Sequence, residues 1–165
     1  MPVRRRRWDE QPATTCEVLL ASDGRQGFSE RAVARAAALS ASNTVAVVTI
    51  AKIYGTQFGL PNPGLLPTKR EVKERQGWVR EAIVSLERRG IDADGQVAAT
   101  RKPRKKLAEI ARLRGVNVVV IDENPDTGLR RLIEGDVGRE LQRKLRKEGI
   151  EVDIVARAGG AETSG

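Results

Sequence analysis

The stretch Val116-Asn117-Val118-Val119-Val120-Ile121 leads directly into Asp122-Glu123-Asn124-Pro125-Asp126 and, after Gly128, into Gly135-Asp136 at the start of a predicted helix. Its first part is a near-continuous apolar run, which is typical of a strand buried on both faces of a parallel sheet. Loops that leave such strands and enter helix N-termini bind anions, because their backbone N–H groups point outward. Here carboxylates stand at those places. The stretch therefore predicts a central strand followed by a phosphate-type loop that carries the wrong charge for phosphate.

Strand and helix patterns alternate on both sides of this stretch. Predicted strands cover residues 17–21, 44–50, 96–100, 116–121 and 152–155. Predicted helices cover residues 29–39, 68–90, 103–115 and 136–147, the second opened by a capping box at Thr68 and Glu71. Asp92 and Asp94 are interpreted as turn residues before the third strand. The order predicts an α/β fold with a single five-stranded parallel sheet, doubly wound and Rossmann-like, with helices on both faces.

In doubly wound sheets, ligands bind at the carboxyl ends of the strands, where the winding direction reverses. If the first and fourth strands are neighbours across that point, Asp23, Gly24, Asp122 and Gly135 converge on one crevice. The topology alone thus predicts that these four residues share one candidate site.

The length of 165 residues is that of one domain with a real hydrophobic core. Residues 1–15, which include the run Arg4-Arg5-Arg6-Arg7, are interpreted as a flexible basic arm. Residues 16–157 form the predicted α/β domain, and residues 158–165 have the composition of a disordered tail.

The numbers of cysteine and histidine residues limit the catalytic and metal sites that the chain can form. Cys16 is the single cysteine and is interpreted as an inert residue at the start of the first strand, while the chain has no His. Histidine-dependent zinc sites and catalytic triads are therefore excluded. No apolar run approaches the roughly 20 residues of a membrane helix, and the N-terminus has no apolar signal core. These features predict a cytoplasmic protein without membrane association.

The chain resembles the universal stress protein family from about Cys16 to Ala156. The residues that carry the resemblance are Val18-Leu19-Leu20-Ala21-Ser22-Asp23-Gly24 before Ser29-Glu30-Arg31-Ala32, the strand at 116–121, and Leu132-Ile133-Glu134-Gly135-Asp136-Val137 before the last helix. The resemblance implies strand order 3-2-1-4-5, a homodimer, and a role in stress survival rather than in turnover. Some members of the family bind ATP and others do not.

The phosphate half of the family's ATP motif is altered in this sequence. ATP-binding members carry Gly-x-x-Gly after the fourth strand and, nine residues further, Gly-Ser or Gly-Thr at a helix start. Asp122 stands at the position of the first Gly and Pro125 at that of the second, Gly135 is retained, and Asp136 replaces the hydroxyl residue. Three of the four positions therefore depart from the motif.

The nucleoside half is closer to the family pattern. Asp23 matches the carboxylate that faces the nucleotide from the end of the first strand, and Ile50 matches the hydrophobic residue whose backbone lies beside the adenine. The resemblance thus implies that Asp23, Ile50, Asp122, Gly135 and Asp136 would be the ligand-binding residues, with the identity of the ligand left open.

Physical chemistry disfavours tight ATP binding. Asp136 is a good N-cap, so its carboxylate would accept from the N–H groups that should hold a phosphate. A carboxylate about 4 Å from a phosphate oxygen costs on the order of 4 kcal/mol at an effective dielectric of about 20. No cofactor is therefore expected, and ATP remains possible but disfavoured. An alternative is a converted site, in which Asp23, Asp122, Asp126 and Asp136 hold a divalent cation that bridges to a phosphate.

The net charge of +8 admits a nucleic-acid partner, but the basic residues are spread along the chain. The densest group is Arg101-Lys102-Pro103-Arg104-Lys105-Lys106 at a predicted helix N-terminus, where the family usually has Gly-Asp/Asn-Pro. An acidic partner or a phosphate-bearing ligand would offset the repulsion there. The group has no interleaved aromatic residues, which argues against nucleic acid.

These observations predict a non-enzymatic regulatory or protective stress-response protein. The expected partner is a second copy of the chain, paired through the edge strand that runs from Val152 to Val155, and an unknown protein partner is also admitted. One alternative is an ATP or Mg-nucleotide sensor that uses the altered loop. A second is a basic module associated with nucleic acid.

Overall fold

The computed structural model describes residues 15–53, 66–123 and 136–156, and places five parallel strands in one sheet of order β3-β2-β1-β4-β5. The strands are β1 (Val18–Ala21), β2 (Thr44–Lys52), β3 (Asp92–Thr100), β4 (Val118–Asp122) and β5 (Glu151–Val155). The predicted fold class and strand order are confirmed. The central strand of the sheet is β1, with β4 beside it, so the prediction that residues 116–121 form the central strand is wrong.

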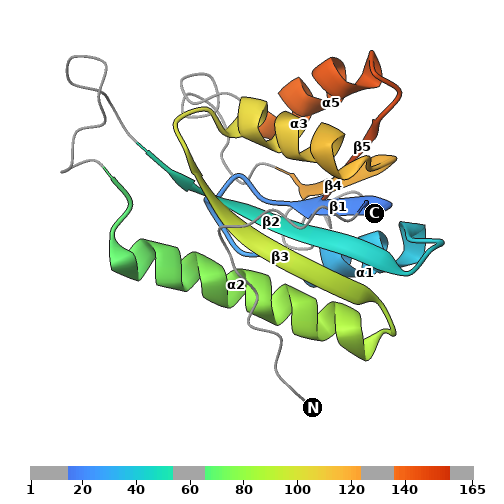
Figure 1. The fold of residues 1–165 in the computed structure, drawn as a ribbon, viewed down its shortest axis with the longest axis horizontal. Helices are drawn as coiled ribbons and strands as arrows, with labels where there is room; N and C mark the ends of the chain where they lie inside the picture. Colours follow the sequence, from blue (N-terminus) through green and yellow to red (C-terminus); the bar gives the residue numbers. More distant parts are fainter. Residues whose placement is uncertain (1–14, 54–65, 124–135, 157–165) are drawn as a thin grey trace, which may run out of the picture.

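The helices cover both faces of the sheet, as Figure 1 shows. In the described residues they are α1 (Glu30–Leu39), α2 (Lys69–Arg88), α3 (Pro103–Arg114) and α5 (Val137–Arg146). Helices α1 and α2 pack on one face, and α3 and α5 lie side by side on the other. No helix among these residues combines the length and apolarity that a bilayer span requires.

Strand β1 shows how the sequence forms two cores. Val18 and Leu20 contribute to the cluster under α1 and α2, whereas Leu19 and Ala21 contribute to the cluster under α3 and α5. All four side chains are fully or almost fully buried. Because successive residues of a strand point to opposite faces, an uninterrupted apolar run is what a strand with helices on both sides requires.

The predicted helix boundaries are confirmed at their caps. Ser29 precedes α1 and its Oγ accepts from the N–H of Ala32 at 3.1 Å. Thr68 and Glu71 form the predicted capping box of α2. Gly115 ends α3 in the left-handed conformation, with φ of 64°, which explains the need for glycine there.

The third strand begins earlier than predicted. β3 starts at Asp92, so the interpretation of Asp92 and Asp94 as turn residues is wrong. The carboxylate of Asp94 forms a paired contact with the buried Arg114, at 2.9 and 2.8 Å. Gly95 lets α2 approach, because a Cβ there would lie 2.4 Å from Cγ1 of Val79. A long-range ion pair and close helix packing thus stabilise a segment whose composition favours a turn.

Cys16 lies just before the N-terminal end of β1 and is buried, with 7% of its surface exposed. Burial raises the pKa of its thiol, an effect that the nearby positive charge of Arg114 opposes. A buried thiol of this kind is a poor nucleophile. The structure therefore agrees with the interpretation of Cys16 as an inert residue.

Some predicted features lie outside the described residues. They include the arm at 1–15 apart from Thr15, the tail at 158–165, and the loop with Pro125, Asp126 and Gly135. β4 begins at Val118, two residues after the predicted start, and ends at Asp122, one residue after the predicted end. Asp122 is therefore a strand residue rather than the first residue of the loop.

Candidate functional site

The candidate crevice lies where β1 and β4 end side by side. Ala21 is paired with Ile121, so Asp23, which follows β1, and Asp122, which ends β4, reach the same edge of the sheet. Asp136 stands at the start of α5. The predicted pairing of β1 with β4 is thus confirmed, whereas Gly135 falls outside the described residues.

Asp122 anchors the start of α1. One carboxylate oxygen accepts from the N–H of Ser29 at 2.9 Å, and the other accepts from the Ser29 hydroxyl. The same hydroxyl caps α1 by accepting from Ala32. Ser29 and Asp122 are 93 residues apart in the sequence, so this contact fastens α1 to the end of the central strand pair. The position that the family motif gives to a phosphate-binding glycine therefore holds an anion of the protein's own.

Asp136 caps α5 as the sequence predicts. Its Oδ1 accepts from the N–H of Arg139 at 3.2 Å, and its Oδ2 lies 3.5 Å from Nε of the same residue. The side chain is 15% exposed. An N-terminal N–H group and an arginine, two groups suited to hold a phosphate, are thus engaged by an internal carboxylate.

Asp23 is held by its own turn. Its Oδ1 accepts from the N–H of Arg25 at 3.1 Å, and its Oδ2 lies 3.5 Å from Nε of Arg25. Gly24 adopts a φ of 91° and packs so close to β2 that a Cβ would lie 2.0 Å from the carbonyl oxygen of Ile50. Only glycine fits this approach. The turn therefore places Asp23 at the crevice but pairs its charge locally.

Ile50 is hydrogen-bonded by Arg75, a residue that the sequence did not indicate as part of the site. Its side chain is fully buried in β2, and its carbonyl oxygen accepts from Nε of Arg75 on α2 at 2.9 Å. Nη2 of Arg75 donates to the carbonyl oxygen of Gly24, also at 2.9 Å. The guanidinium lies 5.4 Å from the centre of the Trp78 ring, within range of a cation–π contact. Arg75 thus binds the backbone beside which the resemblance places the adenine.

A signal for Arg75 was present in the sequence. Arg75 lies three residues after Val72 and three before Trp78, on the apolar stripe of α2. A charged residue at such a position needs a polar partner on the buried side. Periodicity could have indicated the need but not the two carbonyl groups that satisfy it.

The charges at the crevice are therefore matched from within the protein. No group of three or more Cys, Asp or Glu suited to a metal ion occurs among residues 15–53, 66–123 and 136–156. Asp126, the fourth carboxylate of the predicted converted site, lies outside these ranges. Among the described residues, the crevice therefore presents carboxylates and an arginine that already have partners within the protein.

Comparison with known proteins finds similarity in fold but not in sequence. No family model and no curated protein sequence matches the chain. The universal stress protein of Archaeoglobus fulgidus superposes with a TM-score of 0.61 at 17% identity, covering 86% of this chain and 93% of that one. A universal stress protein family structure from Burkholderia pseudomallei gives 0.56 at 18%, with 87% and 98% covered. The Archaeoglobus protein in complex with dAMP gives 0.54 at 18%, with 84% and 96% covered. Over most of its length, the chain has the fold of the universal stress proteins.

Proposed function

We propose that the protein is a non-catalytic stress-response member of the universal stress protein family, acting in the cytoplasm, whose crevice does not bind ATP tightly. The observation that carries the proposal is the internal occupation of the crevice. Asp122 binds the start of α1, and Arg75 binds the carbonyl groups of Ile50 and Gly24. A nucleotide would have to displace both arrangements.

The energetic cost of that displacement is large. A phosphate placed beside Asp122 meets a repulsion on the order of 4 kcal/mol at an effective dielectric of about 20, or about a thousandfold in affinity. An adenine beside Ile50 would break two hydrogen bonds from Arg75, each contributing about 1 kcal/mol. Both halves of the crevice thus oppose a nucleotide, although Asp23 is in the position that the family pattern requires.

The absence of histidine from the sequence and the burial of Cys16 support a non-catalytic role. A nucleophile or general base needs a suitable pKa and access to substrate. Burial raises the pKa of the Cys16 thiol, and its position below β1 is remote from the carboxyl edge. Regulation or protection through binding is the function class that these residues favour.

Calorimetric titration with AMP, ATP and inorganic tripolyphosphate tests the proposal. We expect no saturable heat from AMP below about 1 mM, and an ATP affinity no greater than that of tripolyphosphate, because the crevice contributes nothing to binding adenosine. Micromolar affinity for AMP, or ATP binding more than tenfold tighter than tripolyphosphate, would refute a closed crevice. Tight ATP binding that requires Mg²⁺ would instead favour the Mg-nucleotide sensor.

The proposal includes a homodimer formed through β5. This strand is at the edge of the sheet, and an exposed edge presents unpaired N–H and C=O groups to a second strand. Light scattering across a hundredfold range of concentration should give the dimer mass at the upper end. A monomer mass throughout that range would contradict this part of the proposal.

A further inference from the structure

A pocket rich in positive charge lies at the same carboxyl edge of the sheet, beside β3 and the start of α3. We call it the basic pocket. It has a volume of about 520 Å³, and its walls include Arg101, Lys102, Lys105, Lys106, Ile53 and Ala99. It shares none of its lining residues with the crevice. The volume is within the range of small-molecule sites, about 300–1,000 Å³.

The positive charges of the basic pocket are only partly matched. Nζ of Lys106 lies 3.9 Å from a carboxylate oxygen of Glu109, which is also at the pocket. Arg101, Lys102 and Lys105 form no ion pair with a carboxylate in the part of the chain that the structure describes. Glu109 is thus the one carboxylate among the described lining residues, and it is paired with Lys106 rather than with Arg101, Lys102 or Lys105.

The local backbone adds to this positive potential. Lys102 is the N-cap residue of α3 and makes no side-chain capping hydrogen bond, and Pro103 follows it. The other three described helices are capped by Ser29, Thr68 and Asp136. Because the positive end of a helix dipole disfavours cations, five of them within residues 101–106 repel the helix as well as one another. A bound anion would relieve both repulsions.

We propose that the basic pocket binds a small molecule that carries two or more adjacent phosphate groups. Several cations converging on one concave surface match a compact polyanion better than a single phosphate. Ile53 and Ala99 provide a small apolar wall, and none of the lining residues that the structure describes is aromatic, so none of these side chains offers a ring to stack on a base. The recognised chemistry is therefore the phosphate chain itself.

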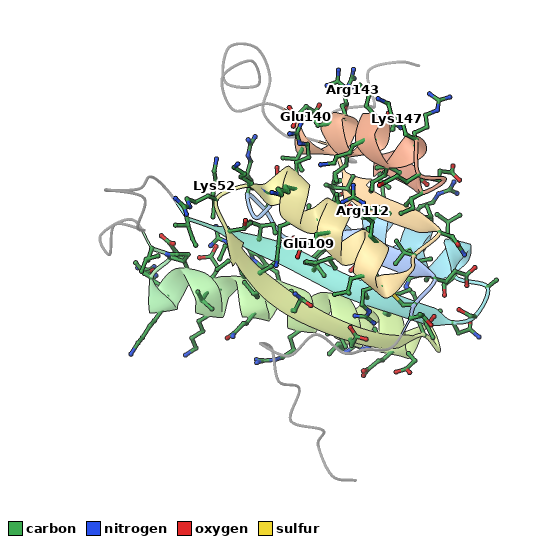
Figure 2. All side chains as sticks on the ribbon, turned by 45° about the horizontal axis from the view of Figure 1, so that its top comes forward. Lys52, Glu109, Arg112, Glu140, Arg143 and Lys147 are labelled. Carbon is green, nitrogen blue, oxygen red and sulfur yellow. The ribbon has the colours of Figure 1, made fainter. Side chains whose placement is uncertain are left out.

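An extended nucleic acid is the alternative ligand. The distribution of positive charge distinguishes it from a small polyphosphate. Further cations, such as Arg143 on α5 and Lys147 at its C-terminal cap, lie on the same side of the molecule as α3 (Figure 2). A nucleic-acid backbone would need these residues as well as the pocket, because it tracks a long basic surface. A small polyphosphate needs the pocket alone.

Two matched triple variants test the proposal by calorimetry with inorganic tripolyphosphate at low salt. One replaces the pocket cations, Arg101→Gln, Lys102→Gln and Lys105→Gln. The other makes the same charge change on α5, Arg143→Gln, Lys144→Gln and Lys147→Gln. We expect the pocket variant to bind at least about tenfold more weakly than the natural chain, and the α5 variant to stay within about threefold. ATP, titrated in parallel, should bind as tripolyphosphate does if only its phosphates are recognised.

Three outcomes would overturn the proposal: no binding by the natural chain, equal weakening in both variants, or binding of a 20-nucleotide single strand that outcompetes tripolyphosphate and is lost in the α5 variant. The last outcome would indicate a nucleic-acid surface. Circular dichroism checks that the pocket variant is folded, which we expect because it removes repulsion at the start of α3. The single variant Lys102→Gln serves if the triple variant is not folded.

Discussion

Two regions at the carboxyl edge of the sheet differ in the charges that surround their helix N-termini. In the crevice between β1 and β4, helix α1 is capped by Ser29 and held by Asp122, and α5 is capped by Asp136. In the basic pocket, α3 begins at Pro103 without a side-chain cap and is surrounded by cations. The crevice thus supplies its own anions, whereas the basic pocket has one carboxylate, that of Glu109, among four cationic side chains.

Reopening the crevice should have the largest effect. The variant Arg75→Met, Asp122→Gly, Asp136→Ser removes the internal guanidinium and both carboxylates. We expect its ATP affinity to rise by about a hundredfold or more, because the repulsion from one carboxylate alone is worth about 4 kcal/mol. Calorimetry measures the change. The control Glu81→Gln, Asp92→Asn removes two carboxylates remote from the crevice and should change ATP binding less than threefold. Unchanged affinity in the triple variant would show that the internal occupants do not exclude the nucleotide.

Removing the anchor of α1 should have the next largest effect. Asp122→Ala deletes two hydrogen bonds made by a carboxylate, and we expect the free energy of unfolding to fall by about 2–3 kcal/mol in urea denaturation. Glu123→Ala, which changes an exposed neighbour, should cost less than about 0.5 kcal/mol. If the two variants were equally stable, Asp122 would be a free crevice carboxylate rather than a structural one.

Arg75 should contribute less to stability than Asp122. Arg75→Met leaves the carbonyl groups of Ile50 and Gly24 without their guanidinium donor, at an expected cost of about 1–2 kcal/mol in the same urea assay. Arg80→Met, on the exposed side of α2, is the matched control and should be near neutral. A loss no larger than that of the control would argue that water replaces the guanidinium and that the nucleoside half is accessible.

The smallest effect is a gain of stability at the basic pocket. Lys102→Ser places a capping residue before α3 and removes a cation from its N-terminus, so we expect about 1 kcal/mol of added stability. The opposite change in the crevice, Asp136→Ala, removes a cap and should cost about 1 kcal/mol. Thermal melting of both variants gives the comparison. Destabilisation by Lys102→Ser would mean that the lysine already has a structural role at this helix start.

Much of the fold could be predicted from local pattern. The apolar run of β4, the capping box at Thr68 and the cap at Asp136 each depend on residues close in sequence, and each is confirmed. The start of β3 differs from the prediction because Asp92, Asp94 and Gly95 have the composition of a turn. The contacts that stabilise them come from Arg114 and Val79, which are remote in sequence. Local propensity gives way to such tertiary contacts.

The positions of the site carboxylates could be predicted, but their partners could not, because those partners are remote in sequence. Parallel topology brings Asp23 and Asp122 to one edge, and the capping role of Asp136 follows from its place before a helix. The partners of Asp122 and Ile50 could not be predicted, since Ser29 lies 93 residues from Asp122 and Arg75 lies 25 residues from Ile50. Whether a crevice is open depends on such pairings. The basic group at 101–106 was evident in the sequence, but the concave surface that gathers it was not.

The most direct test of the contrast between crevice and basic pocket is a ¹⁵N–¹H correlation spectrum recorded during titration with inorganic tripolyphosphate. We expect the amide signals of Ile53, Lys102 and Lys105 to shift until the pocket is saturated with tripolyphosphate, while those of Gly24 and Arg139 at the crevice stay in place. Shifts concentrated at Gly24 and Arg139, with the pocket signals unchanged, would contradict it.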